Sequence, residues 1–444
     1  MTAQTVRPPA PQPDPAEPHA HKQNPKKAAL ASFLGSTLEY YDFVLFGTAS
    51  AIIFNKLFFS GDNPTLATIG SLMTFGVAYI ARPLGGIVMS HVGDRIGRKT
   101  ALMITLVVMG IASITIGLLP TYEQIGITAT ILLLLCRIAQ GFSAGAEAAG
   151  ASTMTMEHSP EGKRGFFTSS VMLGCSAGNV LASIVLVPFM MLPEEQMMSW
   201  GWRVPFLLSA VVLVVAYWVR THLEETPVFE AEEEEEPHGV PALEVLKHQP
   251  MDVVRVFFIT FYSVIQSTFM VYALSYATDH TGIERSTMLI VNALAMGISM
   301  ITIPIMGLVS DRYGRKNTLF VGAVGCVITT YFYFQAITDE NLFLVFVICI
   351  LNQGLFYSCW NGVWCVFFPE MFQQQYRYTG MAMGNQLGLL LTGFAPAISA
   401  AIYGSFGWQG VVVFVASCVC VSCVFIASAK ETAFTKLDDL GKHR

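Results

Sequence analysis

Charged side chains inside apolar stretches are the first feature of this 444-residue sequence that points to chemistry. Glu39 and Asp42 lie three residues apart, so on a helix they share one face. Arg137 and Gln140 have the same spacing, and Glu147 returns to a similar face about three turns later. A charge at the middle of a bilayer costs at least ~2.5–3.5 kcal/mol, so such groups face a bundle interior and mark function. We expect these side chains to line a polar interior, where the Gln140 amide is a further contact for a bound molecule.

Proton loading and anion binding are the chemistry that this set can perform. Arginine stays charged at physiological pH, so only the carboxylates of Glu39, Asp42 and Glu147 can titrate. Arg137 and Arg82, the latter in an earlier apolar stretch, can bind the carboxylate of a substrate. In a purely structural alternative, Arg82 pairs with Glu39 or Asp42. Arg137 then pairs with Glu147, and both ion pairs only hold helices together.

The second half of the chain presents polar and aromatic side chains and no Lys, Arg, Asp or Glu well inside its apolar stretches. Tyr and Trp combine an apolar body with a hydrogen-bonding edge. Asn and Gln offer donors and acceptors for hydroxyl groups. A single such residue is explained as well by a bond between helices, but together they predict a site for the uncharged body of a substrate. The candidates are Tyr262, Gln266, Gln353, Tyr357, Trp360, Asn361 and Gln386.

Two loops repeat at half the chain length. GDRIGRK at 93–99 recurs as SDRYGRK at 310–316, with the two aspartates 217 positions apart. Glu157 and Arg164 likewise have counterparts 213 residues further on. A duplicated apolar body is typical of transporters whose two halves move around a central site.

The residue types of the repeated loops predict a gate. Glycine permits a tight reversal between helices, the aspartate is placed to cap a neighbouring helix, and the arginines can bind carboxylates through two bonds. Such a network closes one face in one state and breaks in the other. In the alternative, the basic loops merely follow the positive-inside rule. The predicted gate residues are Asp94, Arg95, Arg98, Glu157, Arg164, Asp311, Arg312, Arg315, Glu370 and Arg377.

Composition identifies lipid as the solvent of most of the chain. Hydrophobic residues make up 53% and charged residues 13%, against about 25% charged in soluble domains. We predict an all-α membrane protein of twelve transmembrane helices in two pseudo-symmetric six-helix halves. Its predicted parts are a disordered tail 1–27, a first half 28–220, an acidic linker 221–251, a second half 252–429 and a tail 430–444. The spans are expected at about 29–54, 65–90, 101–119, 125–149, 166–192, 204–220, 254–277, 287–309, 317–337, 341–367, 380–404 and 408–429.

The basic residues predict the orientation. Of 25 Lys and Arg residues, 20 fall in the tails or in the loops after even-numbered spans. By the positive-inside rule, both termini are cytoplasmic and the chain is a multi-pass protein of the plasma membrane. The nine cysteines lie mostly in apolar stretches and form no pair of CxxC motifs, which disfavours metal binding. No catalytic triad, phosphate-binding loop or nucleic-acid-binding pattern is evident, so we expect no enzyme and no nucleic-acid partner.

Several motifs together resemble one family of membrane proteins. They are LGSTLEYYDFVLFG at 34–47, ARPLGGIVMSHVGDRIGRK at 81–99, RIAQGFSAGAE at 137–147, SWGWRVPF at 199–206, LEETPVF at 223–229, PEMF at 369–372 and YRYTG at 376–380. The chain resembles the major facilitator superfamily, and within it the metabolite:proton symporter family, whose members carry shikimate, α-ketoglutarate, citrate or proline/betaine. Its motifs are most similar to those of the shikimate-type carriers.

The resemblance implies a secondary active transporter that takes up a small organic acid, such as shikimate or a related carboxylate, together with a proton. The proton is then the coupling ion, no other cofactor is required, and the partners are an organic anion and membrane lipid around a monomer. One alternative is a symporter of a zwitterionic osmolyte such as proline or betaine. More remote alternatives are an uncoupled facilitator and a solute sensor built on a transport fold.

Overall fold

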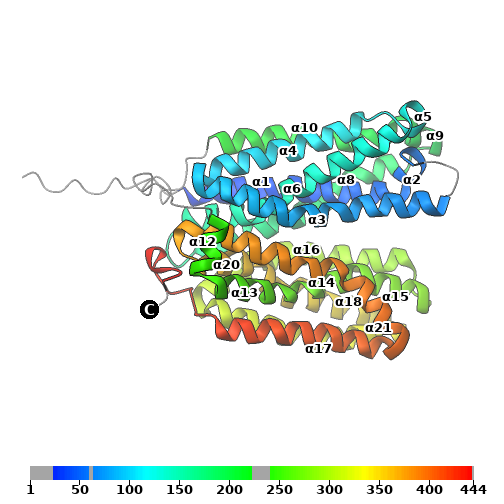
Figure 1. The fold of residues 1–444 in the computed structure, drawn as a ribbon. Coiled ribbons are helices and arrows are strands. Elements are labelled where there is room, and N and C mark those ends of the chain that lie inside the picture. Colours follow the sequence, from blue (N-terminus) through cyan, green and yellow to red (C-terminus); the bar gives the residue numbers. More distant parts are fainter. Residues whose placement is uncertain (1–23, 60–63, 223–240, 443–444) are drawn as a thin grey trace, which may run out of the picture.

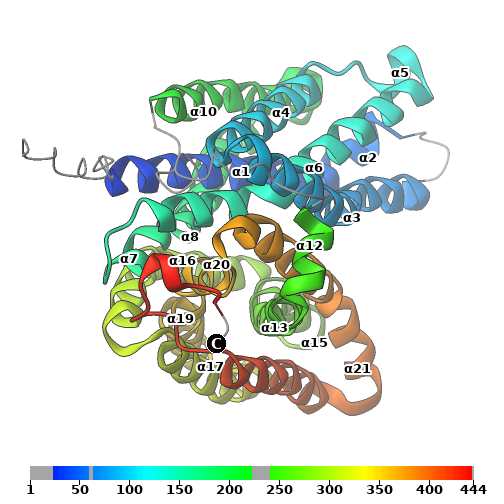
Figure 2. The same ribbon diagram turned by 60° about the vertical axis from the view of Figure 1, so that its left-hand side comes forward.

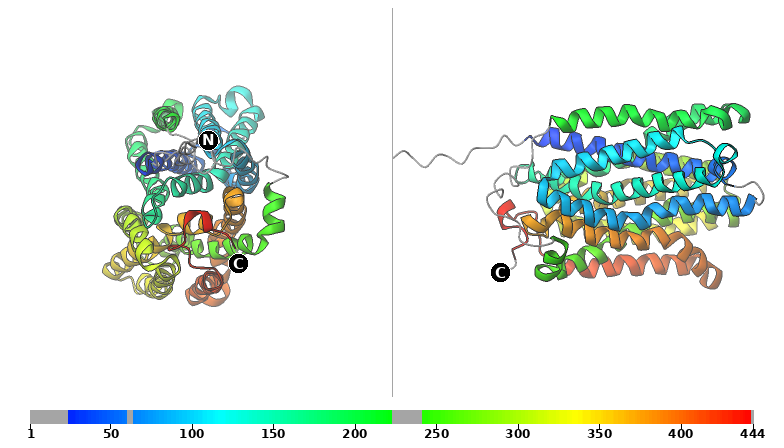
Figure 3. Two further views of the ribbon diagram at one scale, coloured as in Figure 1. Left: turned by 90° about the vertical axis from the view of Figure 1, so that its left-hand side faces the viewer. Right: turned by 45° about the horizontal axis from the view of Figure 1, so that its top comes forward.

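The computed structural model describes residues 24–59, 64–222 and 241–442, and their regular structure is helical. Two bodies of long helices run side by side along one axis (Figure 1). The end-on view shows one bundle stacked on the other (Figure 3). The predicted all-α fold in two halves is therefore confirmed.

The first half holds six long passes with short helices between them. Its helices are α1 (Pro25–Ile52), α2 (Phe54–Leu57), α3 (Pro64–Ile96), α4 (Arg98–Leu118), α5 (Tyr122–Ile125), α6 (Ile127–Glu157), α7 (Arg164–Thr168), α8 (Ser170–Met190), α9 (Glu194–Gln196), the π-helical turn η1 (Met197–Gly201) and α10 (Arg203–Thr221).

The second half follows a short helix, α12 (Pro241–His248), which contacts α3 and the last long helix. Its first passes are α13 (Pro250–Ile259), η2 (Thr260–Ser263), α14 (Val264–Ser267), η3 (Thr268–Tyr272) and α15 (Ala273–His280) in one path, then α16 (Arg285–Tyr313) and α17 (Arg315–Thr338). The others are α18 (Leu342–Cys349), η4 (Ile350–Phe356), α19 (Tyr357–Asn361) and α20 (Trp364–Glu370) in one path, η5 (Gln374–Tyr376), α21 (Arg377–Ser428) and η6 (Leu437–Asp439).

Twelve passes result from these helices. Nine stretches of the described chain are long and apolar enough to cross a membrane. The longest of them, Gln374–Ser428, bends at Gly407, where φ is 66°, and supplies two passes. Helices α1 and α3, of 28 and 33 residues, supply the remaining two and run beside the others (Figure 1).

Two passes of the second half depart from regular α-helix where substrate candidates had been predicted. Tyr262 lies in the 3-10 turn η2, and Gln353 lies in the π-helical turn η4. A 3-10 stretch within a helix often marks a functional hinge, and π-helical turns are frequent at functional sites.

Glycines bring α3 and α6 into backbone contact. A Cβ atom at Gly145 would lie 2.0 Å from the carbonyl oxygen of Arg82, and one at Gly85 would lie 1.8 Å from that of Phe142. Only glycine permits so close an approach. The contact fixes Arg82 of α3 against the face of α6 that carries Arg137 and Gln140.

One end of the bundle carries both repeated loops, and we call it the terminal face. It holds the start of α1, the α3–α4 and α16–α17 turns, and the C-terminal segment, which Figure 2 brings toward the viewer. Gly97 and Gly314 form these turns with φ of 101° and 98°, a backbone region that L side chains rarely adopt. Of the predicted tail 1–27, residues 1–23 lie outside the part of the chain that the structure describes. The acidic run of the predicted linker lies outside it too.

Candidate functional site

An ion pair within the first half faces the interface between the halves. The guanidinium of Arg82 lies 3.1 Å from Glu39 Oε1, and both side chains are buried. The same guanidinium lies over the rings of Phe43 and Tyr79, with its carbon 5.0 and 5.2 Å from the ring centroids. Of the two predicted partners of Arg82, the structure therefore selects Glu39. The pair can exchange a carboxylate of the protein for a carboxylate of a ligand.

Asp42 is held by hydroxyl groups. Ser113 donates a short hydrogen bond to one carboxylate oxygen, and Ser209 donates to the other at 2.5 Å. Gln140 Nε2 donates to Ser113 Oγ at 2.7 Å, and Arg137 donates to Gln140 Oε1 at 3.1 Å. A continuous chain of polar groups thus links the carboxylate of Asp42 to the guanidinium of Arg137.

Glu147 pairs with Arg220, near the end of α10, and not with Arg137. Thr105 also donates to it at 3.1 Å. The alternative pairing of Arg137 with Glu147 is wrong, because ten residues of one helix separate the two side chains by about 15 Å along its axis. Arg220 was missed because it ends an apolar stretch, where a basic residue looks like a positive-inside residue.

A cavity of about 60 Å³ lies where the two halves meet. Both halves line it, the first with Glu39, Tyr40, Arg82 and Cys175 and the second with Gln266, Tyr357, Trp360, Asn361, Trp364, Asn385 and Gln386, among others. A smaller cavity beside it, of about 10 Å³, is lined in part by Glu39, Asp42, Arg82, Arg137 and Gln140. Ligand pockets hold roughly 300–1,000 Å³, so the helices must part for a substrate to enter.

The predicted substrate residues of the second half are placed in two layers. Trp360 lines the cavity, and Tyr262 stacks behind it with ring centroids 4.8 Å apart. Tyr262 does not line this cavity, so it supports Trp360 from behind. Tyr357 donates a long hydrogen bond of 3.5 Å to Gln266, and Gln353 lies in an adjoining cavity of about 10 Å³.

Two hydrogen bonds join the halves between the cavity and the terminal face. Gln386 Nε2 donates to the carbonyl oxygen of Gly145 at 2.7 Å, and Tyr378 Oη donates to that of Ala146 at 3.1 Å. Both donors lie on α21 and both acceptors on α6. Neither bond was predicted, because nothing in the sequence pairs these helices.

The first repeated loop joins the halves at the terminal face. Asp94 accepts bonds from the backbone nitrogen and the hydroxyl of Thr379, at 3.2 and 2.6 Å, near the start of α21. Arg98 and Arg377 both contact Glu157 Oε1, at 3.3 and 2.9 Å. Three of these four gate residues come from the first half and one from the second, so the contact must break if the halves part here.

The second repeated loop makes the counterpart set. Asp311 accepts from the backbone nitrogens of Gly165 and Phe166, at 2.8 and 3.0 Å, at the start of α7. Arg315 binds Glu370 through two bonds of 3.1 and 3.2 Å, and Arg164 reaches Glu370 at 3.2 Å.

Two predicted gate residues lie elsewhere. Arg95 and Arg312 are exposed at the ends of α3 and α16, and the guanidinium of Arg312 lies over the ring of Tyr313. Their buried neighbours Arg98 and Arg315 make the ion pairs with Glu157 and Glu370.

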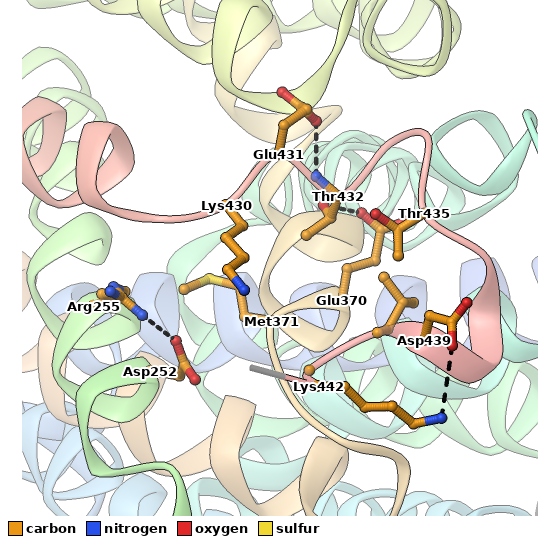
Figure 4. Close-up of a pocket in the computed structure, with 12 residues that line it drawn as sticks. Asp252, Arg255, Glu370, Met371, Lys430, Glu431, Thr432, Thr435, Asp439 and Lys442 are labelled. Atoms are coloured by element: carbon orange, nitrogen blue, oxygen red, sulfur yellow. Dashed lines mark hydrogen bonds and ion pairs between the residues drawn. The ribbon is translucent and has the colours of Figure 1, made fainter. Parts of the chain in front are cut away.

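The C-terminal segment passes beside Glu370, as Figure 4 shows. Arg164 donates to the carbonyl oxygen of Thr435 at 2.7 Å, and Thr432 donates to Glu370 at 2.6 Å. Glu431 accepts from the backbone nitrogen of Arg315 at 2.9 Å. A cavity of about 440 Å³ remains beneath the segment.

No group of three His, Cys, Asp or Glu in the part of the chain that the structure describes is placed to hold a metal ion.

Comparison with known proteins adds family information. Residues 27–255 match the family model "Sugar (and other) transporter", and residues 256–437 match "Major Facilitator Superfamily". The chain is 34% identical over 415 residues to the shikimate transporter of Escherichia coli (strain K12). This alignment covers 92% of this chain and 95% of that protein. It is 34% identical over 394 residues to the proline/betaine transporter of Salmonella typhimurium, which covers 84% and 77%.

Solved structures agree on the fold. A structure of the proton:xylose symporter XylE with 6-bromo-6-deoxy-D-glucose aligns with a TM-score of 0.77 at 15% identity and covers 93% of this chain and 98% of that one. An inward-open XylE from E. coli aligns with a TM-score of 0.63, also at 15% identity, and covers 94% and 99%.

Proposed function

Because the chain belongs to the major facilitator superfamily, and so is a membrane transporter and not an enzyme, we propose that it takes up a small organic acid, such as shikimate or a related carboxylate, together with a proton. The observation that carries this proposal is the Arg82–Glu39 ion pair, which faces a cavity shared by both halves. An arginine that binds a carboxylate of the protein can also bind the carboxylate of a substrate, because the planar guanidinium fork matches a carboxylate group.

Charge balance gives the coupling a physical reason. While Glu39 is ionised, it neutralises Arg82, and an incoming carboxylate meets no free positive charge. A proton on Glu39 removes the negative charge and leaves Arg82 to bind the carboxylate of the substrate. Release of the proton on the other side restores the pair and expels the substrate. Asp42 is a second proton site, which the polar chain through Ser113 and Gln140 connects to Arg137.

Transport then follows from two states of the gate. With the contacts of Glu157 and Glu370 formed, the terminal face is closed; when they break, the halves part there and the cavity opens. We assign the terminal face to the cytoplasm, because most basic residues of the chain lie at this end. In this proposal the protein is a monomer in the plasma membrane, with both termini inside, no cofactor besides the proton, and no nucleic-acid partner.

A zwitterionic osmolyte is the second candidate. Proline/betaine transporters are among the relatives, and Trp360 presents an aromatic ring to the cavity, a surface that attracts quaternary ammonium groups. Under this alternative Arg82 binds the carboxylate end and Trp360 the cationic end. An uncoupled facilitator would show neither proton movement nor accumulation.

Uptake by the purified protein in liposomes tests the proposal. The panel is radiolabelled shikimate, α-ketoglutarate, citrate, aromatic acids and glycine betaine, with and without an inward proton gradient. We expect one acid to accumulate, the outside to become more alkaline as it enters, and a protonophore to abolish accumulation. Accumulation of betaine alone would select the osmolyte reading, and accumulation that follows sodium would reassign the coupling ion.

A further inference from the structure

The central cavity contains hydrogen-bond acceptors that the protein itself does not use. Among the described residues, neither Gln386 Oε1 nor Asn361 Oδ1 has a hydrogen-bond partner. Both side chains are buried, with 3% and 6% of their surface exposed, and both line the cavity. A buried acceptor without a donor is costly, so native proteins seldom leave one unpaired without a reason.

The hydrogen bond of the Gln386 amide nitrogen fixes the orientation of the amide. Its nitrogen donates to the carbonyl oxygen of Gly145 across the interface, so the oxygen is the atom left over. Gly86 leaves room for this approach, because a Cβ atom there would lie 3.2 Å from Gln386 Cγ and 3.0 Å from the oxygen of Gly145. The amide N–H of Gln386 therefore bonds to the first half, and the amide oxygen has no partner and is available to accept a hydrogen bond.

The position of this bond links it to the gate. Gly145 lies on α6 between Gln140 and Glu157, so the bond is formed between the polar interior and the terminal face. Tyr378, two turns earlier on α21, makes the neighbouring bond to Ala146 and is not among the residues that line the cavity.

On the basis of the proposed function, we propose that the substrate is a carboxylic acid with hydroxyl groups remote from its carboxylate, and that Gln386 couples recognition of a hydroxyl to closure of the terminal face. A substrate hydroxyl donates to the unpaired oxygen of Gln386, and a second donates to Asn361. The carboxylate lies at the Arg82 side of the cavity. Glycine betaine has no N–H or O–H donor and satisfies neither acceptor.

A pair of acids of one ring size tests the first part. Shikimate and its analogue without hydroxyl groups, cyclohexenecarboxylate, compete for binding to the purified wild-type protein. We expect shikimate to bind roughly two- to tenfold tighter for each hydrogen bond gained. Asn361→Leu and Gln386→Met, which keep the size of the side chain, should each reduce this preference.

The second part needs a measure of conformation. Spin labels at Ile96 and Tyr313, exposed at the equivalent ends of α3 and α16, report the distance between the halves at the terminal face. The label sites are introduced after exposed Cys420 and partly buried Cys136 and Cys423 have been replaced. Gln386→Met and Tyr378→Phe each remove one bond between the halves, so each should raise the population with separated labels.

The matched variants separate the two roles of Gln386. Tyr378→Phe should shift the label distances and keep the preference for hydroxyl groups. Asn361→Leu should lower the preference and leave the distances as in wild type. Only Gln386→Met should change both.

Unchanged preference and unchanged distances in Gln386→Met would overturn the inference, as would a wild-type protein that binds cyclohexenecarboxylate as tightly as shikimate. Failure of the proposed function looks different, because the wild-type protein would then accumulate no acid under a proton gradient.

Discussion

At the scale of residues, two carboxylates of α1 differ in what surrounds them. Glu39 has an arginine as partner, whereas Asp42 has two serine hydroxyls. A proton on Glu39 would end its ion pair and free Arg82 for a substrate carboxylate, whereas a carboxylate held by hydroxyls keeps its place in either protonation state. The two groups are therefore suited to different steps, substrate exchange and proton storage.

Substitution of Arg82 by lysine tests anion binding. Lysine keeps the charge but loses the two parallel bonds, so the apparent affinity for a carboxylate substrate should fall by about 1–3 kcal/mol. Arg203→Lys is the control, because Arg203 bonds the carbonyl oxygens of Gly117 and Leu119, away from the cavity. Equal affinities in both variants and wild type would exclude Arg82 from binding.

Neutral variants of the carboxylates test proton coupling. In Glu39→Gln and Asp42→Asn no proton can be lost, so we expect exchange of labelled for unlabelled substrate to persist while accumulation driven by a pH gradient is abolished. Counterflow and gradient-driven uptake in the same liposomes measure the two activities. If both variants still accumulate substrate, the proton is carried elsewhere, and Glu147 becomes the next candidate.

At the scale of elements, close helix contact decides where the charges lie. Gly145 brings α6 against α3, and Gly174 and Gly178 do the same for α8 against α1, where added Cβ atoms would meet backbone oxygens at 2.3 and 2.5 Å. Carriers need rigid halves that move as units, and these contacts hold the first half together.

Gly145→Val should therefore destabilise the protein. The added side chain collides with the carbonyl oxygen of Arg82, and overpacking of this kind costs roughly 1–3 kcal/mol. Gly404→Ala is the control, because nothing lies within 4 Å of a Cβ atom there. Thermal unfolding of both variants in detergent is the measurement, and a Gly145→Val protein as stable as the control would refute the tight contact.

The first repeated loop offers a matched pair for the gate. Arg98 is buried against Glu157, whereas Arg95, three residues earlier, is exposed. Removal of one partner of a buried ion pair is costly, about 3–5 kcal/mol, so Arg98→Ala should favour an open terminal face and slow turnover at equal surface expression. Arg95→Ala should transport nearly as wild type. The reverse order would assign the gate to the exposed arginine.

At the scale of the whole molecule, the C-terminal segment joins the halves. Its carbonyl oxygen at Thr435 accepts from Arg164 of the first half, while Glu431 caps the start of α17 in the second. The segment therefore contacts both halves at the terminal face.

A chain that ends after Thr432 should open more readily at the terminal face. Arg164 loses its bonds to the carbonyl oxygens of residues 433 and 435 but keeps Glu370. Spin-label distances between α3 and α16 should lengthen in a larger fraction of molecules, with membrane insertion intact. An unchanged distance distribution would show that the segment has no part in closure.

The architecture and the contacts of the repeated loops could be predicted from the amino-acid sequence. Twelve passes followed from apolar stretches, and the two halves followed from the repeat of Asp94 and Glu157 at Asp311 and Glu370. Such features are encoded locally, by hydropathy and by identical residues at fixed spacing, so they need no knowledge of how helices pack. The carboxylate partners of Arg98 and Arg315 were predictable for the same reason.

The partners of the polar side chains inside the bundle could not be predicted in this way, because they depend on how the helices pack. Arg220 and Glu147 are 73 residues apart in the chain, Ser209 and Asp42 are 167 apart, and Gln386 and Gly145 are 241 apart. These contacts depend on how far each helix is rotated about its axis and how closely it approaches its neighbour. Helical spacing gives the face that a residue shares with others on its own helix, but the neighbour that this face meets is set by packing between helices.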